Sequence, residues 1–277
     1  MSNNTKPFSV LLCVYGKDNA EHFQIAVNSI LDQTVRPAQV VLVVDGPVPP
    51  ELDQVIQRYE TEPVFQVIRL EVNQGHGIAR RTGLEACSND LVAVMDADDI
   101  SVNDRFEKQL AAFDADPSLD IVGGIITEFI HETGNTAGRR EVFPNDDQIK
   151  EDMKKRCPMN LVTVMFRKSS VEKAGGFVDW YCEEDYYLWL RMVQADMRFG
   201  NVADNLVFVR VGEEMYQRRG GWKYFTSEAR LQKWMLQHRV IGFSTYVVNV
   251  AKRLIVQVLL PNRLRSWVFQ KFARKQV

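Results

Sequence analysis

The segment Leu91-Val-Ala-Val-Met-Asp-Ala-Asp-Asp99 decides the fold and points to the chemistry of this chain. Its first part, Leu91–Asp96, is a short and almost continuous apolar run, which is typical of a strand buried on both faces of a parallel sheet. The run leads into three carboxylates within four residues, Asp96, Asp98 and Asp99. Because ligands of open α/β sheets bind at the carboxyl ends of strands, we expect a binding site at this edge.

Carboxylates this close together repel one another and raise one another's pKa unless a cation lies between them. Since they offer only oxygen, they favour Mg²⁺ or Mn²⁺ shared with a phosphate group of the ligand. The alternative is that these acids cap the following helix. Ser101-Val-Asn-Asp104 already has the capping-box pattern for that helix. We therefore prefer the metal site.

The same buried-strand pattern recurs toward the amino terminus, at Phe8–Tyr15, Val40–Asp45 and Phe65–Glu71. Between the first two strands, Phe23, Val27, Ile30 and Leu31 recur at helical spacing. A second helix, Gly75–Cys87, precedes the strand that ends in the carboxylates. Repeated strand–helix–strand units predict an α/β fold built on a mostly parallel sheet with flanking helices.

The rest of the chain changes character. We expect a helix with Phe106, Leu110 and Phe113 inward, strands at Asp120–His131, Leu161–Phe166 and Leu206–Val211, and a helix over Glu183–Val193. A turn at Thr133–Gly138 and a return arm at Arg139–Phe143 would make a hairpin. From Glu213 the pattern is mostly helical, with breaks near Gly242 and at Pro261.

Composition bounds the class of protein. The 277 residues are 45% hydrophobic and 25% charged, which excludes a disordered chain, a collagen and a small disulfide scaffold. The four cysteines form no CxxC pair, so a cysteine zinc site is not expected. The amino terminus lacks the pattern of a secretory signal. Because Lys252 and Arg253 interrupt the longest apolar candidate, Tyr246–Leu260, we expect a soluble or peripheral protein.

The net charge of −2 hides an asymmetry. No acid follows Glu228, and the last 49 residues hold ten Lys or Arg, which leaves the first 228 residues with a net charge of −12. One helical face would carry Leu264, Trp267, Val268 and Phe272, and another would carry Arg263, Gln270 and Arg274. This pattern predicts a helix lying in an anionic membrane interface, and we expect no nucleic-acid partner. The alternative is a helix packed on the rest of the protein.

Three further groups are candidates. Glu184 and Asp185 open the helix after Glu183; adjacent helical residues point about 100° apart, so one would be a general base and the other structural. The alternative is that these acids only favour the helix dipole. Glycines and arginines in Asn73–Arg81 suit an anion at a helix start, or a solvated basic face. Asp45 ends the second strand before Gly46 and is either a ligand or a turn residue.

Taken in order, these pieces resemble a known family. FSVLLCVYGKD, SILDQT, VVDGP, NQGHGIARRTGL, MDADD, DRFEKQL, GGF and EEDYYLWLRM together look like family 2 glycosyltransferases of the GT-A fold, from about Phe8 to Arg210. The chain is most similar to bacterial members that build O-antigen, capsule or exopolysaccharide units. The resemblance implies a GT-A catalytic domain over residues 1–212, with a Rossmann-like nucleotide-binding sheet, and a helical basic extension over 213–277. Residues 1–100 would bind the nucleotide sugar and 101–212 the acceptor.

The resemblance also implies roles for single residues. Val14, Tyr15 and Asp45 would flank the base of a UDP-sugar, with Arg80 nearby. Asp96 would contact the ribose, and Asp98, with Asp96, would hold Mn²⁺ or Mg²⁺ on the diphosphate. Asp185 would be the general base.

The implied reaction is inverting transfer of a hexose, galactose or glucose, from a UDP-sugar to an undecaprenyl-diphosphate-linked or other growing glycan, with formation of a β-linkage. The implied place is cytoplasmic, on the inner face of the cell membrane. Two alternatives remain: a sugar nucleotidyltransferase, although the loop after the first strand is not glycine-rich and basic, and a non-enzymatic sugar-binding subunit.

Overall fold

The computed structural model describes residues 6–212 and 220–261. In chain order the elements are β1 (Phe8–Tyr15), α1 (Ala20–Leu31), β2 (Gln39–Asp45), α2 (Pro50–Glu60), β3 (Phe65–Arg69), α3 (His76–Ala86), β4 (Leu91–Asp96), β5 (Ile100–Ser101), α4 (Arg105–Ala115), β6 (Ile121–Phe129), β7 (Thr136–Arg140), α5 (Asp146–Met153), η1 (Leu161–Thr163), β8 (Met165–Arg167), α6 (Lys168–Lys173), α7 (Glu184–Gln194), β9 (Phe199–Arg210), α9 (Trp222–Gln237), α10 (Phe243–Leu254) and η2 (Ile255–Leu259).

A single mixed sheet organises the described chain, in the order β3-β2-β1-β4-β8-β6-β9-β5, with β7 paired to β6. The first four strands are parallel, and β8 joins them to the second half by pairing antiparallel with both β4 and β6. The register sets Tyr15 opposite Asp45 and Cys13 opposite Asp96. The ends of β1, β2 and β4 therefore meet at one edge of the sheet.

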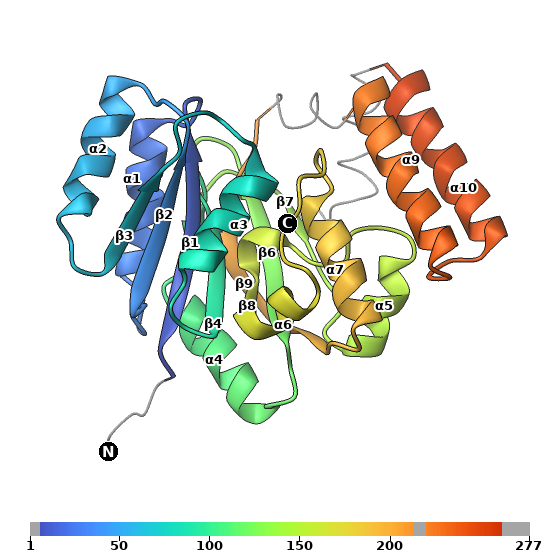
Figure 1. Ribbon diagram of the computed structural model, residues 1–277, viewed down its shortest axis with the longest axis horizontal. Coiled ribbons are helices and arrows are strands. Elements are labelled where there is room, and N and C mark those ends of the chain that lie inside the picture. Colours follow the sequence, from blue (N-terminus) through green and yellow to red (C-terminus); the bar gives the residue numbers. More distant parts are fainter. Residues whose placement is uncertain (1–5, 213–219, 262–277) are drawn as a thin grey trace.

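Helices cover both faces of this sheet, which confirms the predicted α/β fold (Figure 1). Alternate residues of β1 enter different cores: Leu12 packs with α1, α2 and α4, and Leu11 packs with α3 and α7. The continuous apolar runs of these strands thus supply side chains to the hydrophobic cores on both faces of the sheet. Phe106, Leu110 and Phe113 of α4 face inward as expected. Helices α2, α5 and α6 are not among the predicted elements.

Several predicted boundaries in the second half are wrong, two of them at the strand from Leu161 and at the hairpin. The segment Leu161–Phe166 is not one strand: Leu161–Thr163 forms a 3₁₀ turn, and the strand begins at Met165. The turn is favoured because the carbonyl of Asn160 accepts hydrogen bonds from both the amide and the hydroxyl of Thr163, at 2.8 and 2.7 Å. The hairpin is confirmed, but its return strand begins at Thr136, inside the predicted turn.

The predicted capping box at Ser101 is also wrong. Ser101 lies in β5, and the residue before α4 is Asp104, whose side chain makes no capping bond. The side chain of Gln33, at the end of α1, takes that place: its Oε1 accepts from the amide of Phe106 at 3.3 Å. Its Nε2 donates to the carbonyl of Val102 at 2.7 Å. A tertiary contact thus replaces the local cap.

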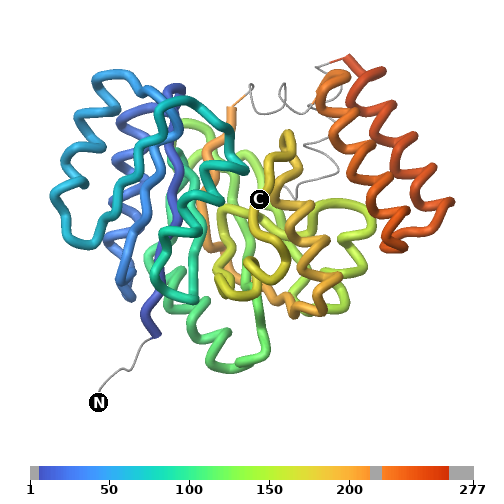
Figure 2. The backbone as a smooth tube through the Cα atoms, viewed as in Figure 1, coloured from blue at the N-terminus to red at the C-terminus, as the bar shows by residue number. Residues whose placement is uncertain are grey.

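The described part of the C-terminal extension is helical, as predicted, and breaks at Gly242 between α9 and α10. Figures 1 and 2 show this helical pair at one end of the molecule, with α10 outermost. The predicted face from Leu264 to Phe272 lies outside the described residues. Within 6–212 and 220–261, no helix combines the length and the apolar character that a membrane crossing requires.

Candidate active site

A buried arginine joins the two acidic motifs of the sequence. Arg80, on α3, donates through Nη1 to Glu184 Oε1 at 2.7 Å and through Nη2 to Asp96 Oδ1 at 3.1 Å. Burial alone would lower the pKa of Arg80, but the carboxylates of Asp96 and Glu184 raise it overall, so the guanidinium stays charged. The end of β4 and the start of α7, far apart in sequence, therefore lie side by side.

The carboxylates after β4 have different surroundings. Asp99 is buried, and its Oδ1 accepts from the amide of Arg210 at 2.8 Å, so it anchors the end of β9. Burial, then the charges of Asp98 and Asp96, raises the pKa of Asp99 well above its usual range. Asp99 is thus structural, whereas Asp96 is 40% exposed at its side chain.

The residues present fit a divalent cation held together with a phosphate. Among the described residues, no group of three or more His, Cys, Asp or Glu side chains could hold a metal ion. Mg²⁺ sites of this kind need only one or two carboxylates, because substrate phosphates and water complete the coordination. Burial is the main cause of the raised pKa of Asp99, and the negative charges of Asp98 and Asp96, which a cation would neutralise, add to it.

Asp45 organises the loop that opens α3. Its two carboxylate oxygens accept from the amides of Gln74 at 2.7 Å and Gly75 at 2.9 Å. Gly46 follows with φ of 84°, and a Cβ there would lie 2.5 Å from the amide nitrogen of Asn73. The Asp-Gly pair therefore holds the end of β2 close to the loop that opens α3.

The end of β1 supplies two candidates with different environments. The side chain of Val14 is fully in the core, so only its main chain borders the edge of the sheet. Tyr15 is half-buried, and its ring lies edge-on to His76, with 6.0 Å between the ring centres. Tyr15, Asp45, Arg80, Asp96 and Glu184 thus gather around one edge.

Asp185 follows Glu184 in α7 and lies close to charged groups and to the thiol of Cys157. Its Oδ1 accepts from the amide of Tyr186 at 2.6 Å, and the thiol of Cys157 lies 3.7 Å from Oδ2. Burial, followed by the charge of Glu184, raises the pKa of Asp185 to about 6, against the opposing effects of the Tyr186 amide, Arg80 and Arg140. A carboxylate of this pKa is suited to accept a proton near neutral pH.

Sequence reasoning did not identify Arg105 or Cys157. Arg105 is fully buried beneath β4, where Nη2 donates to the carbonyl of Val94 at 2.8 Å and Nε donates to Gln109 at 3.1 Å. Burial lowers the pKa of Arg105 to about 9. The motif DRFEKQL contains both Arg105 and Gln109, but nothing in its pattern indicates that these polar side chains lie under the carboxylate strand.

The C-terminal helices α9 and α10 contribute charged side chains close to Glu183, the residue before α7. Arg253 of α10 pairs with Glu228 of α9 at 3.1 Å, and Gln257 also donates to Glu228. Buried Glu183 lies against this group: burial, then Glu228 and Asp185, raises its pKa well above the usual range, and Arg253 opposes the shift. The extension is therefore part of the environment of the Glu183–Asp185 segment.

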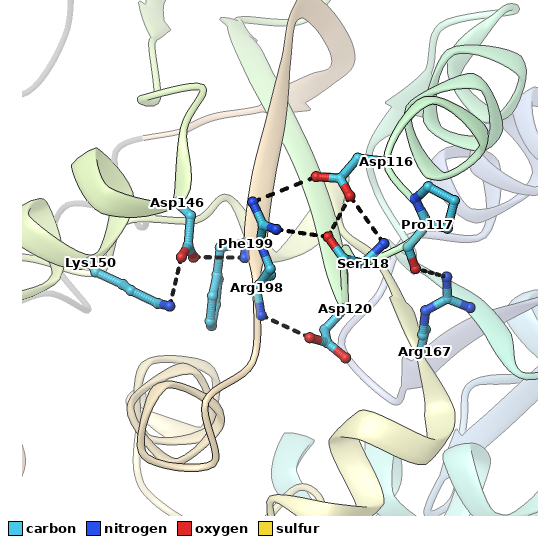
Figure 3. Close-up of polar contacts among 9 residues, drawn as sticks. All are labelled: Asp116, Pro117, Ser118, Asp120, Asp146, Lys150, Arg167, Arg198 and Phe199. Carbon is cyan, nitrogen blue, oxygen red and sulfur yellow. Dashed lines mark hydrogen bonds and ion pairs between the residues drawn. The ribbon is translucent and has the colours of Figure 1, made fainter.

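A cavity of about 600 Å³ lies elsewhere. Phe199, which lines this cavity, pairs with Ile121; Ile121 also pairs with Phe166, and Phe166 pairs with Val92 near the start of β4. Asp96 is at the other end of β4, so the cavity lies at the opposite end of the strands. Three of its charged residues, Asp116, Asp146 and Arg198, already pair, as Figure 3 shows: Arg198 reaches Asp116 and Ser118, and Asp146 accepts from Lys150 and the amide of Phe199. We therefore assign the active site to the carboxylate edge.

Comparison with known proteins agrees with this geometry. The model of "Glycosyl transferase family 2" matches residues 9–175. An uncharacterized glycosyltransferase of Haemophilus influenzae is 37% identical over 97% of this chain and 99% of its own length. The Escherichia coli UDP-Gal:alpha-D-GlcNAc-diphosphoundecaprenol beta-1,3-galactosyltransferase is 33% identical over 99% of both chains.

The fold has solved counterparts as well. A mannosyltransferase from Pyrobaculum calidifontis, in complex with GDP-Man and Mn²⁺, superimposes with a TM-score of 0.61 at 15% identity, over 95% of this chain and 72% of that one. This likeness supports the GT-A fold expected from the sequence. Because the family model spans more than half of the chain and two relatives above 30% identity match it almost end to end, this chain belongs to glycosyl transferase family 2.

Proposed function

We propose that this glycosyltransferase moves a hexose, galactose or glucose, from a UDP-sugar to a diphosphoundecaprenol-linked or growing surface-glycan acceptor, with inversion to a β-linkage. Support for the donor and acceptor classes comes from the full-length similarity to the E. coli galactosyltransferase. The structural observation that supports the proposal is the Arg80 bridge, which joins Glu184, the neighbour of Asp185 in the chain, to Asp96 at the end of β4. Family membership disfavours the nucleotidyltransferase and the non-enzymatic subunit.

In this mechanism Asp185 is the general base. Its carboxylate takes the proton of the acceptor hydroxyl while that oxygen attacks the anomeric carbon of the donor. The bond from this carbon to UDP breaks, and UDP leaves with the bonding electrons. One such displacement inverts configuration, so an α-linked donor gives a β-linked product. Since Glu184 is engaged by Arg80 at 2.7 Å, its role is to hold the start of α7 rather than to accept this proton.

For the donor, we assign the base to the main chain of Val14, to Tyr15 and to the loop held by Asp45, and the ribose to Asp96. Asp98 and Asp96 would hold Mn²⁺ or Mg²⁺, which stabilises the negative charge of departing UDP when bound. Arg80 acts by fixing the position of Asp96. Residues 1–100 would thus serve the donor and residues 101–212 the acceptor, within a single sheet.

We also propose that the protein works at the inner face of the cell membrane, attached peripherally through residues 213–277. The support is the charge of the sequence, which has ten basic and no acidic residues after Glu228. An anionic leaflet attracts each such residue by about 1 kcal/mol. A lipid-linked acceptor gives the attachment its reason.

A donor screen scored by UDP release tests the proposed reaction. The purified full-length protein is incubated with Mn²⁺, GlcNAc-diphospholipid and, in separate reactions, UDP-galactose, UDP-glucose and UDP-GlcNAc. We expect acceptor-dependent release with a hexose donor and its loss in Asp185→Asn. Asp114→Asn, which removes an exposed carboxylate distant in sequence from the site, is the control. Acceptor-dependent release that persists at the wild-type rate in Asp185→Asn would contradict the assignment of the base.

A further inference from the structure

Helix α10 buries polar side chains and exposes apolar ones. Asn249 of α10 and Gln257 of the continuing turn η2 are buried, 6% and 4% exposed, and Arg253 lies midway between them in the sequence, on the same side of the helix. Away from these residues, Phe243, the first residue of α10, is 71% exposed and Leu259, also in η2, is 65% exposed. A surface helix of a globular protein normally shows the reverse, with apolar residues toward the core.

The exposed apolar residues form one continuous surface. At about 100° per residue they occupy roughly half of the helix circumference. We call this surface the outer face of α10; its members are Phe243, Val247, Val248, Ala251, Ile255 and Leu259. Single exposed apolar residues need no explanation, but a contiguous patch of this kind marks an interaction site. Figure 1 shows that α10 is the outermost element of its end of the molecule.

Polar contacts fix the helix in this orientation. Asn249 donates to the carbonyl of Lys154 and to Gln232, both at 2.9 Å. Arg253 pairs with Glu228 at 3.1 Å and donates to the carbonyl of Lys155 at 3.2 Å. Turning the apolar face inward would break these contacts and leave buried polar groups unpaired, which is costly. The outer face is therefore a stable feature of the fold.

The exposed charge of the C-terminal helices is of one sign. In residues 220–261 the exposed charged side chains are all basic: Lys252 on α10, Arg239 between the helices, and Lys223, Arg230 and Lys233 on α9, where Lys223 and Arg230 lie over the rings of Tyr181 and Trp180. The acid of this segment, Glu228, is engaged by Arg253 and Gln257. A surface that combines apolar side chains with positive charge matches an anionic bilayer. It disfavours a second copy of the chain, because two positive faces would repel each other.

We infer that the outer face of α10 is a lipid-docking face, which inserts its apolar side chains among the headgroups of an anionic membrane while the flanking lysines and arginines contact lipid phosphates. The inference deepens the proposed function, because it rests on a membrane-bound acceptor for its biological reason. It also assigns docking to a surface within the described fold, independent of residues 262–277.

Sedimentation with vesicles tests this directly and needs no catalysis. The full-length protein is mixed with vesicles of phosphatidylglycerol and phosphatidylethanolamine, or of phosphatidylcholine alone, at low and high salt. We expect binding to the anionic vesicles that weakens with salt. Phe243→Ser should lower the partition coefficient by about tenfold or more, since one large apolar side chain stays in water. Lys252→Gln should lower it about fivefold, the equivalent of about 1 kcal/mol.

Phe143→Ser is the matched control, because it makes the same change at another exposed phenylalanine, outside the C-terminal helices; it should bind like wild type. Thermal melts confirm that each variant is folded. Absence of binding to anionic vesicles overturns the inference, as does binding that Phe243→Ser leaves unchanged. Concentration-dependent dimerisation that Phe243→Ser abolishes, without vesicle binding, would instead assign the face to a second copy. Failure of every UDP-sugar in the donor screen would reject the proposed function separately.

Discussion

At the scale of the residue, the environment of Asp185 makes a prediction about pH. Burial and Glu184 raise the pKa of this carboxyl to about 6, and only the ionised form accepts a proton. We therefore expect kcat/KM for transfer to fall about tenfold per pH unit below about 6 and to level off above it. Asp185→Asn should lose about 10²–10⁴-fold in kcat at every pH while it retains UDP binding.

The nearby Arg140 offers a test of the direction in which charge shifts the pKa of Asp185. Arg140 lowers the pKa of Asp185 through its positive charge, so Arg140→Gln should raise that pKa and shift the acid limb of the profile to higher pH. Arg139→Gln, which removes the adjacent charge of the same strand, is the control. An acid limb that stays in place, or moves down, in Arg140→Gln would show that another group is titrating.

Single residues are predictable where a motif carries them. Asp96 and the pair Glu184 and Asp185 stand out as acids at strand and helix ends, and the choice of Asp185 as the base rests on the family resemblance. The structure brings the two motifs together through Arg80, which contacts Asp96 and Glu184. Arg105 was not recognised as a buried group because its partners, Val94 and Val164, lie on other elements. A pattern of spacing describes neighbours in sequence and is silent about such contacts.

At the scale of the element, the start of α4 shows the same limit and can be tested. Gln33 accepts from the amide of Phe106 and donates to Val102, in place of the predicted cap at Ser101. Gln33→Ala removes these bonds and should lower the free energy of unfolding by about 1–2 kcal/mol. Gln57→Ala, an exposed glutamine on α2, should change it by less than about 0.5 kcal/mol. Urea denaturation measures both, and equal effects would refute the capping role.

Helix α10 supplies a second comparison, between neighbouring charges. Arg253 faces Glu228 and Glu183 with its side chain 12% exposed, whereas Lys252 is exposed. Arg253→Gln leaves these acids without their positive partner and should destabilise the fold by about 3 kcal/mol. Lys252→Gln should stay within about 0.5 kcal/mol of wild type in the same urea titration. A larger loss in Lys252→Gln would mean that the helix is oriented differently.

The helices and strands were predicted well where burial is uniform. Strands β1 and β4 have the bounds that the sequence indicated, because both of their faces are covered and their residues are almost all apolar, up to Asp96 at the end of β4. Strand β9 extends from Phe199, well before the predicted start at Leu206, because Asn201, Asp204 and Asn205 interrupt its apolar pattern. The inside-out face of α10 was not recognised, since an amphipathic pattern does not tell which side meets the core.

At the scale of the whole molecule, the site depends on parts that lie far apart in the chain. Arg80 comes from the amino-terminal half, Glu184 and Asp185 from the second half, and Arg253 from the C-terminal helices. Arg80 is compensated by Glu184 and Asp96, and Arg253 is compensated by Glu228 and lies close to Glu183, so each buried charge depends on a partner from another part of the chain. The family resemblance predicted which residues belong to the catalytic domain, but it carried no information on the contribution of α9 and α10.

The carboxylates gathered at the end of β4 also predict how ligands stabilise the folded protein. If Asp96 and Asp98 hold a divalent cation on the donor diphosphate, UDP and Mn²⁺ should bind the folded state cooperatively. At ligand concentrations about 100 times Kd, binding adds about 2.7 kcal/mol. At about 2–4 °C per kcal/mol, Tm should rise by about 5–10 °C, and by less with UDP or Mn²⁺ alone.

The variant Asp98→Asn tests which residue binds the cation. It should keep the Tm of the free protein within about 2 °C, lose the increment in Tm due to Mn²⁺ and abolish metal-dependent transfer. The control Asp114→Asn should behave like wild type in differential scanning fluorimetry. A full Mn²⁺ increment in Asp98→Asn would place the cation on other ligands, because no carboxylate at position 98 would then be needed to bind it.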